Sequence, residues 1–487
     1  MAIERTEKPF VRLFLSILIG AGIAMLSVFV ASLDYKTAIA TIIGLSIGGI
    51  FIHFLNQKSF SYLLIMAMAF GIPFNLDINL FFRPYIGVTS VDIGITFLSC
   101  ITLCISFFYE RIVGGIKRFY SNKWIILSML LYMGSGALSL YNAASKELVV
   151  LELVRLAMLL IICYVIMNFG KKEYMSVFIL TLSITVFLEF LLAFYQYKTG
   201  RLFGLYAFGE TRYEFGVGYL QVRASGTFSH ANGLAYFFEM TLPILLAMVI
   251  VEDNAKLKLW YAAAFVFGFF GLVITLSRGG WLATAISLPI VFTSLYIKRF
   301  AEKKYMVALF FGLLIVMILG YFASPTIIRR LETYDFGAAG TRVPLNRAAF
   351  SIIKQFPITG VGLNNFALVF RTYDTTGGSE IFKAQGLVHN LFLGVWTETG
   401  IIGISTFVLI FITTFLIALK LIYKVPYWYT GVLVGVFAGL LAHFIHGMFD
   451  PGFRILMSTS MLVYSMIGLV GAVSVYYKTQ YKKLEAK

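Results

Sequence analysis

Charged residues are scarce in this chain: Asp, Glu, Lys and Arg make up 13% of its 487 residues, while 60% are hydrophobic. A soluble domain carries roughly 25% charged residues, so the composition excludes a soluble globular protein. Cysteine is also rare. Cys100, Cys104 and Cys163 all lie inside apolar segments, which leaves neither a disulfide framework nor the cysteine spacing of a metal site. The composition indicates a polytopic membrane protein.

Long apolar runs account for most of the chain. A membrane-spanning helix needs roughly 17–25 predominantly apolar residues, and fourteen runs of about this kind can be placed. We expect an all-α polytopic membrane protein, a single transmembrane domain over residues 1–487 with 12–14 transmembrane helices. The first run is longer than the apolar core of a cleaved signal peptide, so we interpret it as a helix. The candidate spans are residues 11–33, 37–55, 60–80, 88–108, 124–141, 148–169, 174–195, 231–251, 258–276, 280–297, 304–324, 392–419, 427–447 and 456–477.

Basic residues at alternate ends of these spans predict the orientation. Lys and Arg concentrate in short cytoplasmic loops, and here they gather at the ends that include both termini. We therefore expect both termini in the cytoplasm, and the net charge of +16 does not indicate nucleic acid. Two long outer loops, residues 196–230 and 325–387, hold eleven further basic residues that topology does not require. They favour an anionic ligand on the outer face.

The loop 325–387 contains a helical pattern. In RVPLNRAAFSIIKQF apolar residues recur at helical spacing, and Pro357 then ends the pattern. We expect an amphipathic helix at the membrane interface, preceded by Arg342 and carrying Arg347, each of which can bind a lipid headgroup or a substrate phosphate. The apolar positions are Val343, Leu345, Ala349, Phe350, Ile353 and Phe356.

The segment RASGTFSHANGLAYF leads from the first long outer loop into a span. Ser229 is a candidate cap for that helix, and Asn232 falls in its first turn, where free backbone N–H groups favour an anion. An ordinary capped helix start explains these residues equally well. The neighbouring Arg223 and His230 favour contact with a ligand.

A very short outer turn, TLSRGGW, carries Arg278 beside two glycines that allow close approach. Arginine at a helix end often extends toward lipid headgroups. A turn does not require arginine, however, so we predict that Arg278 belongs to the functional site.

His389 and Asn390 open a later span in VHNLFLGVWTETGIIG, and Glu398 follows nine residues after His389. An imidazole at the membrane edge can simply be an amphipathic side chain at the interface, with no role in function. It is also the usual general base for an attacking hydroxyl, because it titrates near neutral pH. We predict a catalytic role for His389 and substrate contacts for Asn390 and Glu398.

Three polar residues, His443, His446 and Asp450, share one helical face in HFIHGMFD. They can form a metal site, but the HExxH pattern is absent, and a hydrogen-bonded helix end is the more common arrangement. We therefore expect His446 and Asp450 to hold the substrate-binding residues in place by hydrogen bonds, without contacting substrate themselves. We expect no metal and no cofactor.

Two charges lie deeper in the spans. Arg155 and Glu189 each fall several residues below the outer ends of neighbouring spans, about 10 Å in at 1.5 Å per residue. Pairing with each other would relieve the cost of an isolated charge in lipid. Glu152, one turn from Arg155, is a competing partner.

The glycine spacing of the segment FPITGVGLNNF is similar to that of a glycine-rich phosphate loop. It lacks the third glycine of GxGxxG, and no βαβ pattern surrounds it. A tight turn is the better interpretation.

The ordered motifs RASGTFSHANGLA, SRGGWLA, TRVPLNRAAFSIIKQFPITGVGLNNF, HNLFLGVWTETGIIG and HGMFD together resemble the bacterial O-antigen ligase and O-antigen polymerase superfamily, over roughly residues 220–475. The resemblance implies a GT-C-type helical bundle in the bacterial cell membrane. Its members are metal-independent, inverting glycosyltransferases, which move a glycan from undecaprenyl diphosphate to an acceptor outside the membrane. Arg278, Arg342 and His389 correspond to the family's functional residues, and Arg223 matches the arginine before its GTF segment.

Two other classes remain open. A transporter or flippase of lipid-linked sugars can have as many spans, but it is expected to show inverted repeats and polar residues near the midplane, whereas the polar motifs here gather at one predicted face. A non-catalytic assembly partner would leave His389 and the arginines dispensable. Among enzymes, the sequence does not choose between a ligase and a polymerase.

Overall fold

The computed structural model describes residues 57–74, 77–80, 90–113, 120–210, 223–297, 336–374 and 386–481. The predicted spans 11–33, 37–55 and 304–324 lie outside these residues. The chain divides into two compact units, residues 1–64 with 102–119, and residues 65–101 with 120–487. In the first unit the structure describes only the start of one helix and the end of another. All further description concerns the second unit.

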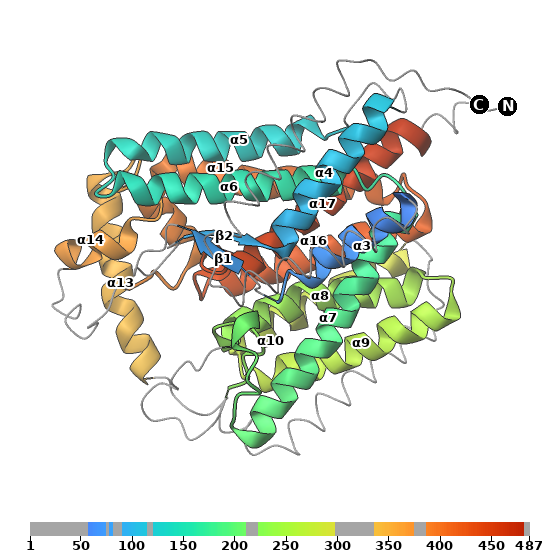
Figure 1. The fold of residues 1–487 in the computed structure, drawn as a ribbon. Helices are drawn as coiled ribbons and strands as arrows, with labels where there is room; N and C mark the ends of the chain where they lie inside the picture. The colour runs from blue at the N-terminus through green and yellow to red at the C-terminus, as the bar shows by residue number, and fades with distance from the viewer. Residues whose placement is uncertain are drawn as a thin grey trace, which may run out of the picture. The chain divides into compact units, whose positions relative to one another are not determined.

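Helices dominate the described residues (Figure 1). Within these residues eight helices are long and apolar enough to cross a membrane, so the predicted all-α polytopic membrane fold is confirmed. All the described α-helices, whether or not they are long enough to span, are α3 (Gln57–Phe70), α4 (Ile95–Val113), α5 (Lys123–Leu138), α6 (Lys146–Met167), α7 (Lys172–Thr199), α8 (Ala231–Val251), α9 (Ala255–Ile274), α10 (Arg278–Ile297), α13 (Phe336–Gln355), α14 (Phe366–Tyr373), α15 (Leu391–Ile422), α16 (Tyr427–Gly447) and α17 (Met457–Tyr476).

The predicted span 60–80 is wrong. Helix α3 ends at Phe70, and the chain continues into a short strand, β1 (Asp77–Leu80), which pairs antiparallel with β2 (Val91–Gly94). The sequence NLDINL after the helix includes polar residues at alternate positions, a pattern of a half-exposed strand rather than of a span.

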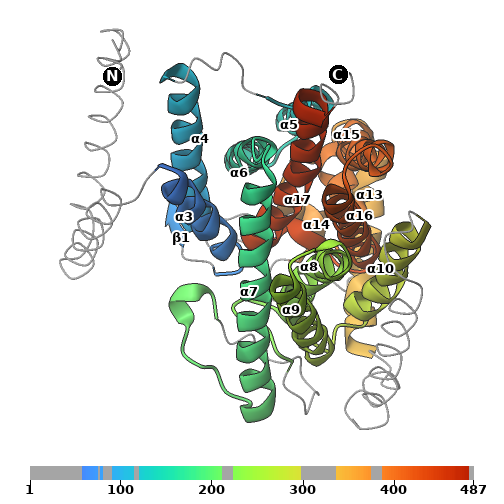
Figure 2. The same ribbon diagram turned by 90° about the vertical axis from the view of Figure 1, so that its right-hand side faces the viewer.

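Helices α8, α16 and α17 form the interior of the bundle, as the view in Figure 2 shows. Three glycines at four-residue spacing line the face of α16 toward α8, and an added Cβ at Gly435 would lie 2.7 Å from the Cα of Ile244. Gly439 faces the Met240 carbonyl in the same way, and Gly431 faces Val251. Small residues at this spacing let two helix backbones approach closely in a membrane. The same stripe, continued by one turn, reaches His443.

Helix α15 is broken at Gly400, which has φ +64° and ψ −165°. The segment 357–362 packs against the break, and its turns confirm the interpretation of FPITGVGLNNF. The Ile401 amide donates to the Pro357 carbonyl at 2.8 Å, and the Gly362 amide donates to the Glu398 carbonyl at 3.0 Å. A broken helix is tolerated at membrane depth when other protein groups satisfy its backbone, and this turn does so.

Helix α13 occupies the predicted amphipathic segment. It begins at Phe336, earlier than expected, so Arg342 lies within the helix and does not precede it. The buried face is also rotated from the prediction, because Val343 and Phe350 are exposed. Leu345, Ala348, Ala349 and Ile352 pack instead on Val361, Phe366, Phe370 and Val388. Figure 1 shows α13 and α14 beside one end of α5, α6 and α15.

We predict that Gly400→Ala destabilises the protein. An added Cβ would overlap the Ile358 carbonyl, and the positive φ adds backbone strain of about 1–2 kcal/mol. With overpacking of roughly 1–3 kcal/mol, a clear fall in the unfolding temperature is expected in detergent.

The matched control is Gly204→Ala, since Gly204 has φ +103° but no heavy atom within 4 Å of an added Cβ. It should show the backbone strain alone. Equal effects of the two substitutions would mean that the turn does not support the break.

Candidate functional site

A polar network joins the ends of α8, α10, α15 and α16, which lie at the same end of the bundle. Asp450, just after α16, is at its centre. Its Oδ2 accepts from the Asn232 side-chain amide at 2.8 Å, and its Oδ1 accepts from the Tyr236 hydroxyl. His389 Nδ1 lies 3.8 Å from Asp450 Oδ2. Segments that are more than two hundred residues apart in the chain therefore meet at one carboxylate.

Asn232 links this carboxylate to two other motifs. Its Oδ1 accepts from Arg223 Nη2 at 2.8 Å and from Ser277 Oγ at 3.1 Å. The cap of α8 differs from the prediction: it is His230, not Ser229, whose Nδ1 accepts from the Asn232 backbone amide at 3.0 Å. Asn232 is therefore fixed at both its backbone and its side chain.

The SRGG turn is held tightly against α16. Leu276 adopts φ +54°, an unusual conformation for a residue with a branched side chain. Half-buried Arg278 opens α10. An added Cβ at Gly279 would lie 2.6 Å from His446 Nε2, so only glycine fits between the turn and this imidazole.

Glu239 lies beneath the turn and is completely buried. Its Oε1 is 3.0 Å from His443 Nδ1, and its Oε2 is 2.6 Å from His446 Nδ1. His443 Nε2 accepts from the Phe453 amide at 3.1 Å. Both imidazoles are therefore hydrogen-bonded to protein groups. Within the described ranges no group of three or more His, Cys, Asp or Glu side chains is placed to hold a metal ion.

His389 is partly exposed, whereas its neighbour Asp450 is largely buried. The His389 side chain is 35% exposed and that of Asp450 is 11% exposed. Burial opposes ionisation of Asp450, but the neighbouring His389, and then His446, favour it, so the pKa of Asp450 lies below its usual value. The separation of 3.8 Å is an ion-pair distance for a protonated histidine and is longer than a hydrogen bond.

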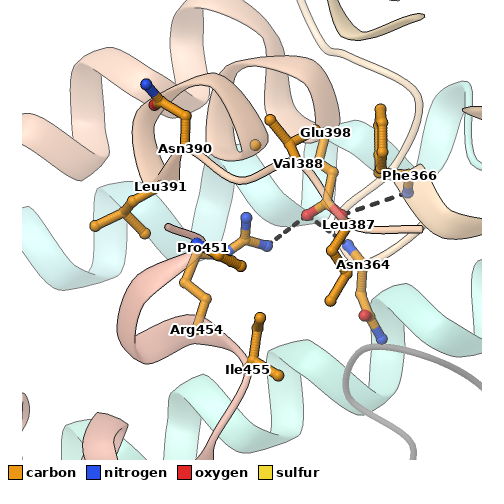
Figure 3. A pocket seen from close by; sticks show the side chains of 11 residues that line it. Asn364, Phe366, Leu387, Val388, Asn390, Leu391, Glu398, Pro451, Arg454 and Ile455 are labelled. Carbon is orange, nitrogen blue, oxygen red and sulfur yellow. Dashed lines mark hydrogen bonds and ion pairs between the residues drawn. The ribbon is translucent and has the colours of Figure 1, made fainter. Parts of the chain in front are cut away.

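Beside His389 there is a pocket, shown in Figure 3, whose walls come from the start of α15, the turn before α14 and the segment 451–455. Glu398 and Arg454 form an ion pair on its wall. Glu398 also accepts from the Asn364 amide at 3.0 Å, so its position is fixed from two sides. Val388 and Asn390, which flank His389 in the chain, line the same pocket.

Asn390 has a defined structural role as the cap of α15. Its side chain accepts from the Leu393 amide at 2.9 Å and donates to the Met448 carbonyl at 3.0 Å. These bonds hold the start of α15 against the end of α16. The backbone at His389 is thereby placed opposite Asp450.

Two arginines that the sequence predicted as site residues lie outside this network. Arg342 and Arg347 are on α13, half-buried and exposed respectively. Neither is paired with a carboxylate in the part of the chain that the structure describes. The structure thus brings Arg223, Asn232, His389, His446 and Asp450 to one network. Arg278 follows Ser277 of that network in the chain, Asn390 holds the start of α15 beside it, and Glu398 lies on the adjoining pocket.

The predicted pair of Arg155 and Glu189 is wrong. The alternative partner, Glu152, is the one that the structure places beside Arg155. Arg155 Nε lies 3.3 Å from Glu152, and its Nη1 donates to the Arg454 carbonyl at 2.7 Å. Glu189 instead accepts from the Thr227 amide at 3.1 Å. Arg155 therefore supports the segment that carries Arg454.

Sequence reasoning missed Glu239, Tyr236 and Arg454. Glu239 had a signal, since a lone carboxylate inside an apolar span usually marks a functional position. Tyr236 had none, because a tyrosine near a span end is common. Arg454 stands in HGMFDPGFR, the last polar motif, but its partner Glu398 is 56 residues away in the sequence.

The fold and the network define a polytopic membrane protein with a charged, hydrogen-bonded site at one end of its helical bundle. Residues 263–408 match the family model described as O-antigen ligase. The match runs from α9 to α15 and takes in the SRGG turn, α13 and His389. It confirms the resemblance to the O-antigen ligase superfamily over these residues and points to a membrane protein of the O-antigen ligase or polymerase type. No curated protein matches the chain.

We predict that Gly279→Ala reduces activity with little loss of folding. The new methyl group would push the SRGG turn from His446, and a displacement of about 1 Å at a site can cost roughly 100-fold in rate. The measurement is glycan transfer by the purified variant in liposomes, beside its unfolding temperature.

Gly134→Ala in α5 is the control, because no heavy atom lies within 4 Å of its added Cβ. Its activity should equal that of the wild type. Normal activity of Gly279→Ala would show that the turn has no part in the site.

Proposed function

We propose that this protein is an inverting, metal-independent glycosyltransferase that moves a glycan from undecaprenyl diphosphate to an acceptor. It lies in the bacterial cell membrane, with both termini in the cytoplasm and the site on the opposite face. The observation that carries the proposal is the meeting of His389 and Asp450 with Arg223 and the Arg278 turn at one end of the bundle.

The arginines are suited to a diphosphate leaving group. A guanidinium group binds phosphate oxygens through two parallel hydrogen bonds and stays charged at any physiological pH. Arg223 is already oriented by Asn232 and by the Thr275 carbonyl, at 3.0 Å. In the proposal Arg278, beside the network, and Arg342, which lies outside it on α13, both bind the diphosphate when substrate is present. Arg223 and Arg347 assist, and no metal is needed to neutralise the leaving group.

His389 acts as the general base in this mechanism. Its Nε2 takes the proton from the acceptor hydroxyl as that oxygen attacks the anomeric carbon, and the bond from that carbon to the diphosphate oxygen breaks. The electron pair leaves with undecaprenyl diphosphate, whose growing negative charge the arginines stabilise. Attack opposite the leaving group inverts the anomeric centre. Asp450, ionised and 3.8 Å from Nδ1, stabilises the imidazolium that forms.

The small pocket next to the His389 backbone is a candidate contact for a hydroxyl group of the acceptor sugar. Val388 and Asn390, which flank His389 in the chain, line it, although the imidazole itself does not. Glu398, Arg454 and Asn390 offer hydrogen-bond acceptors and donors, while Leu391 and Ile455 offer apolar surface. This mixture suits a sugar, which has hydroxyl groups around an apolar ring.

We predict that His389→Ala, Arg278→Ala and Arg342→Ala each abolish transfer while the protein stays folded. Loss of a general base typically costs about 10²–10⁴-fold in rate. The measurement is transfer from an undecaprenyl diphosphate-linked glycan in liposomes with EDTA present, because EDTA removes any metal contribution.

Lys354→Ala is the control, since Lys354 is an exposed basic residue on the same helix as Arg342. It should keep its activity. Loss of wild-type transfer in EDTA would contradict metal independence. Movement of intact donor across the liposome membrane, with no new glycosidic bond, would show instead that the protein is a transporter.

A further inference from the structure

Glu239 is a buried carboxylate that the mechanism above leaves without a role. It lies on α8 eight residues after Ala231, about 12 Å along the helix at 1.5 Å per residue. A carboxylate so placed in an apolar bundle is costly unless it is paired. Its partners are His443 and His446 on α16, at 3.0 and 2.6 Å. The glycine stripe of α16 makes this possible, because it brings the two backbones close one turn before His443.

The donors and acceptors around Asn232 define the orientation of its amide. Arg223 can only donate, and it meets Oδ1 at 2.8 Å. The Asp450 carboxylate can only accept, and it meets Nδ2 at 2.8 Å. Oδ1 is therefore the group that faces Ser277 Oγ at 3.1 Å, and since a carbonyl oxygen cannot donate, the Ser277 proton points to Asn232.

This arrangement determines the protonation of His446. Ser277 has a single proton, which is used by Asn232, so its Oγ can only accept from His446 Nε2 at 3.3 Å. His446 Nδ1 meanwhile donates to Glu239 at 2.6 Å. Both ring nitrogens then carry protons. His443 differs, because its Nε2 accepts from the Phe453 amide and has no proton.

We infer that Glu239 is a positioning residue, which holds His446 as an imidazolium and thereby orients Asp450 toward His389. The inference rests on the proposed glycosyl transfer for its effect on rate, though not for its structural part. The orienting chain consists of Glu239, His446, Ser277, Asn232, Asp450 and His389. It orients groups and does not conduct protons, because the Asn232 amide does not pass a proton on.

A change at Glu239 is expected to reverse the direction of the bonds in this chain. In Glu239→Gln the carboxylate that bonds to His446 Nδ1 becomes a neutral amide, and the ring no longer contacts a negative charge, since Asp450 acts on it only from beyond hydrogen-bond distance. The imidazole is then expected to be neutral, with its Nε2 accepting the Ser277 proton. Asn232 then loses one of its two donors on Oδ1 and can turn away from Asp450. The reacting base is affected more than donor binding, so kcat should fall more than KM rises.

Direct observation of the imidazolium tests the structural part without any transfer assay. The chain has only five histidines, so ¹⁵N-histidine labelling in nanodiscs near neutral pH gives few signals, and His446→Gln assigns one set. We expect two protonated ring nitrogens at His446 in the wild type and one in Glu239→Gln. A neutral His446 in the wild type would overturn the inference.

Kinetics test the positioning role. We expect Glu239→Gln to lower kcat by about 100-fold, the cost of a displacement of about 1 Å at a catalytic group. Glu252→Gln is the matched control, because Glu252 is a buried carboxylate at the opposite end of the same helix and pairs with Trp428 at 3.0 Å. It should keep the wild-type kcat.

A double-mutant cycle covers the case in which Glu239→Gln acts through general instability. Ser277→Ala interrupts the orienting chain while it leaves Glu239 with both histidines. If the chain is continuous, the double variant should lose no more activity than the larger single loss, since coupled residues are not additive. Additive losses, or equal kcat values for Glu239→Gln and Glu252→Gln, would overturn the positioning role. Absence of wild-type transfer would overturn the proposed function alone, because the ¹⁵N measurement still decides the state of His446.

Discussion

The close approach of α8 and α16 is the constraint on which the rest of the site depends. Gly435 and Gly439 let the backbone of α16 lie directly against that of α8, and Gly431 makes room for the Val251 side chain. Helices in lipid associate through such packing, because lipid chains are as apolar as the side chains themselves. The next turn carries His443, and the contact places it against Glu239. Larger residues in the stripe would separate the helices and leave a buried carboxylate without partners.

At the end of α16 that carries His443 and His446, polar side chains form hydrogen bonds with one another inside the apolar bundle. Asp450, Glu239, His443 and His446 each have at least one hydrogen-bond partner, which offsets the free energy of removing them from water. The network fixes Asn232, Asp450 and the SRGG turn together, because each bond restricts a side chain that the next bond needs. A site built in this way is organised before substrate arrives, and preorganised dipoles are the main source of transition-state stabilisation in many enzymes.

The short first part of α15 fixes the position of His389. Helix α15 starts at the Asn390 cap and breaks at Gly400, and the segment 357–362 satisfies the backbone of the break. The short first part of α15 is therefore held by the loop that also carries α13. The ion pair of Glu398 and Arg454 ties the same short helix to the segment after α16.

The sequence by itself determined the fold class and the ends of several spans, including residues 231–251 and 427–447, because apolar length and helix-ending residues are local properties. Its ordered motifs also carried the resemblance to the O-antigen ligase superfamily. It also indicated most residues of the network, since polar groups at span ends are conspicuous in an apolar chain. Only the tertiary structure decided their partners: Arg155 pairs with Glu152, His230 caps α8, and Glu239 holds two histidines of α16. Hydrogen-bond partners depend on how helices distant in sequence rotate and approach, and that is set by packing, which no local pattern records.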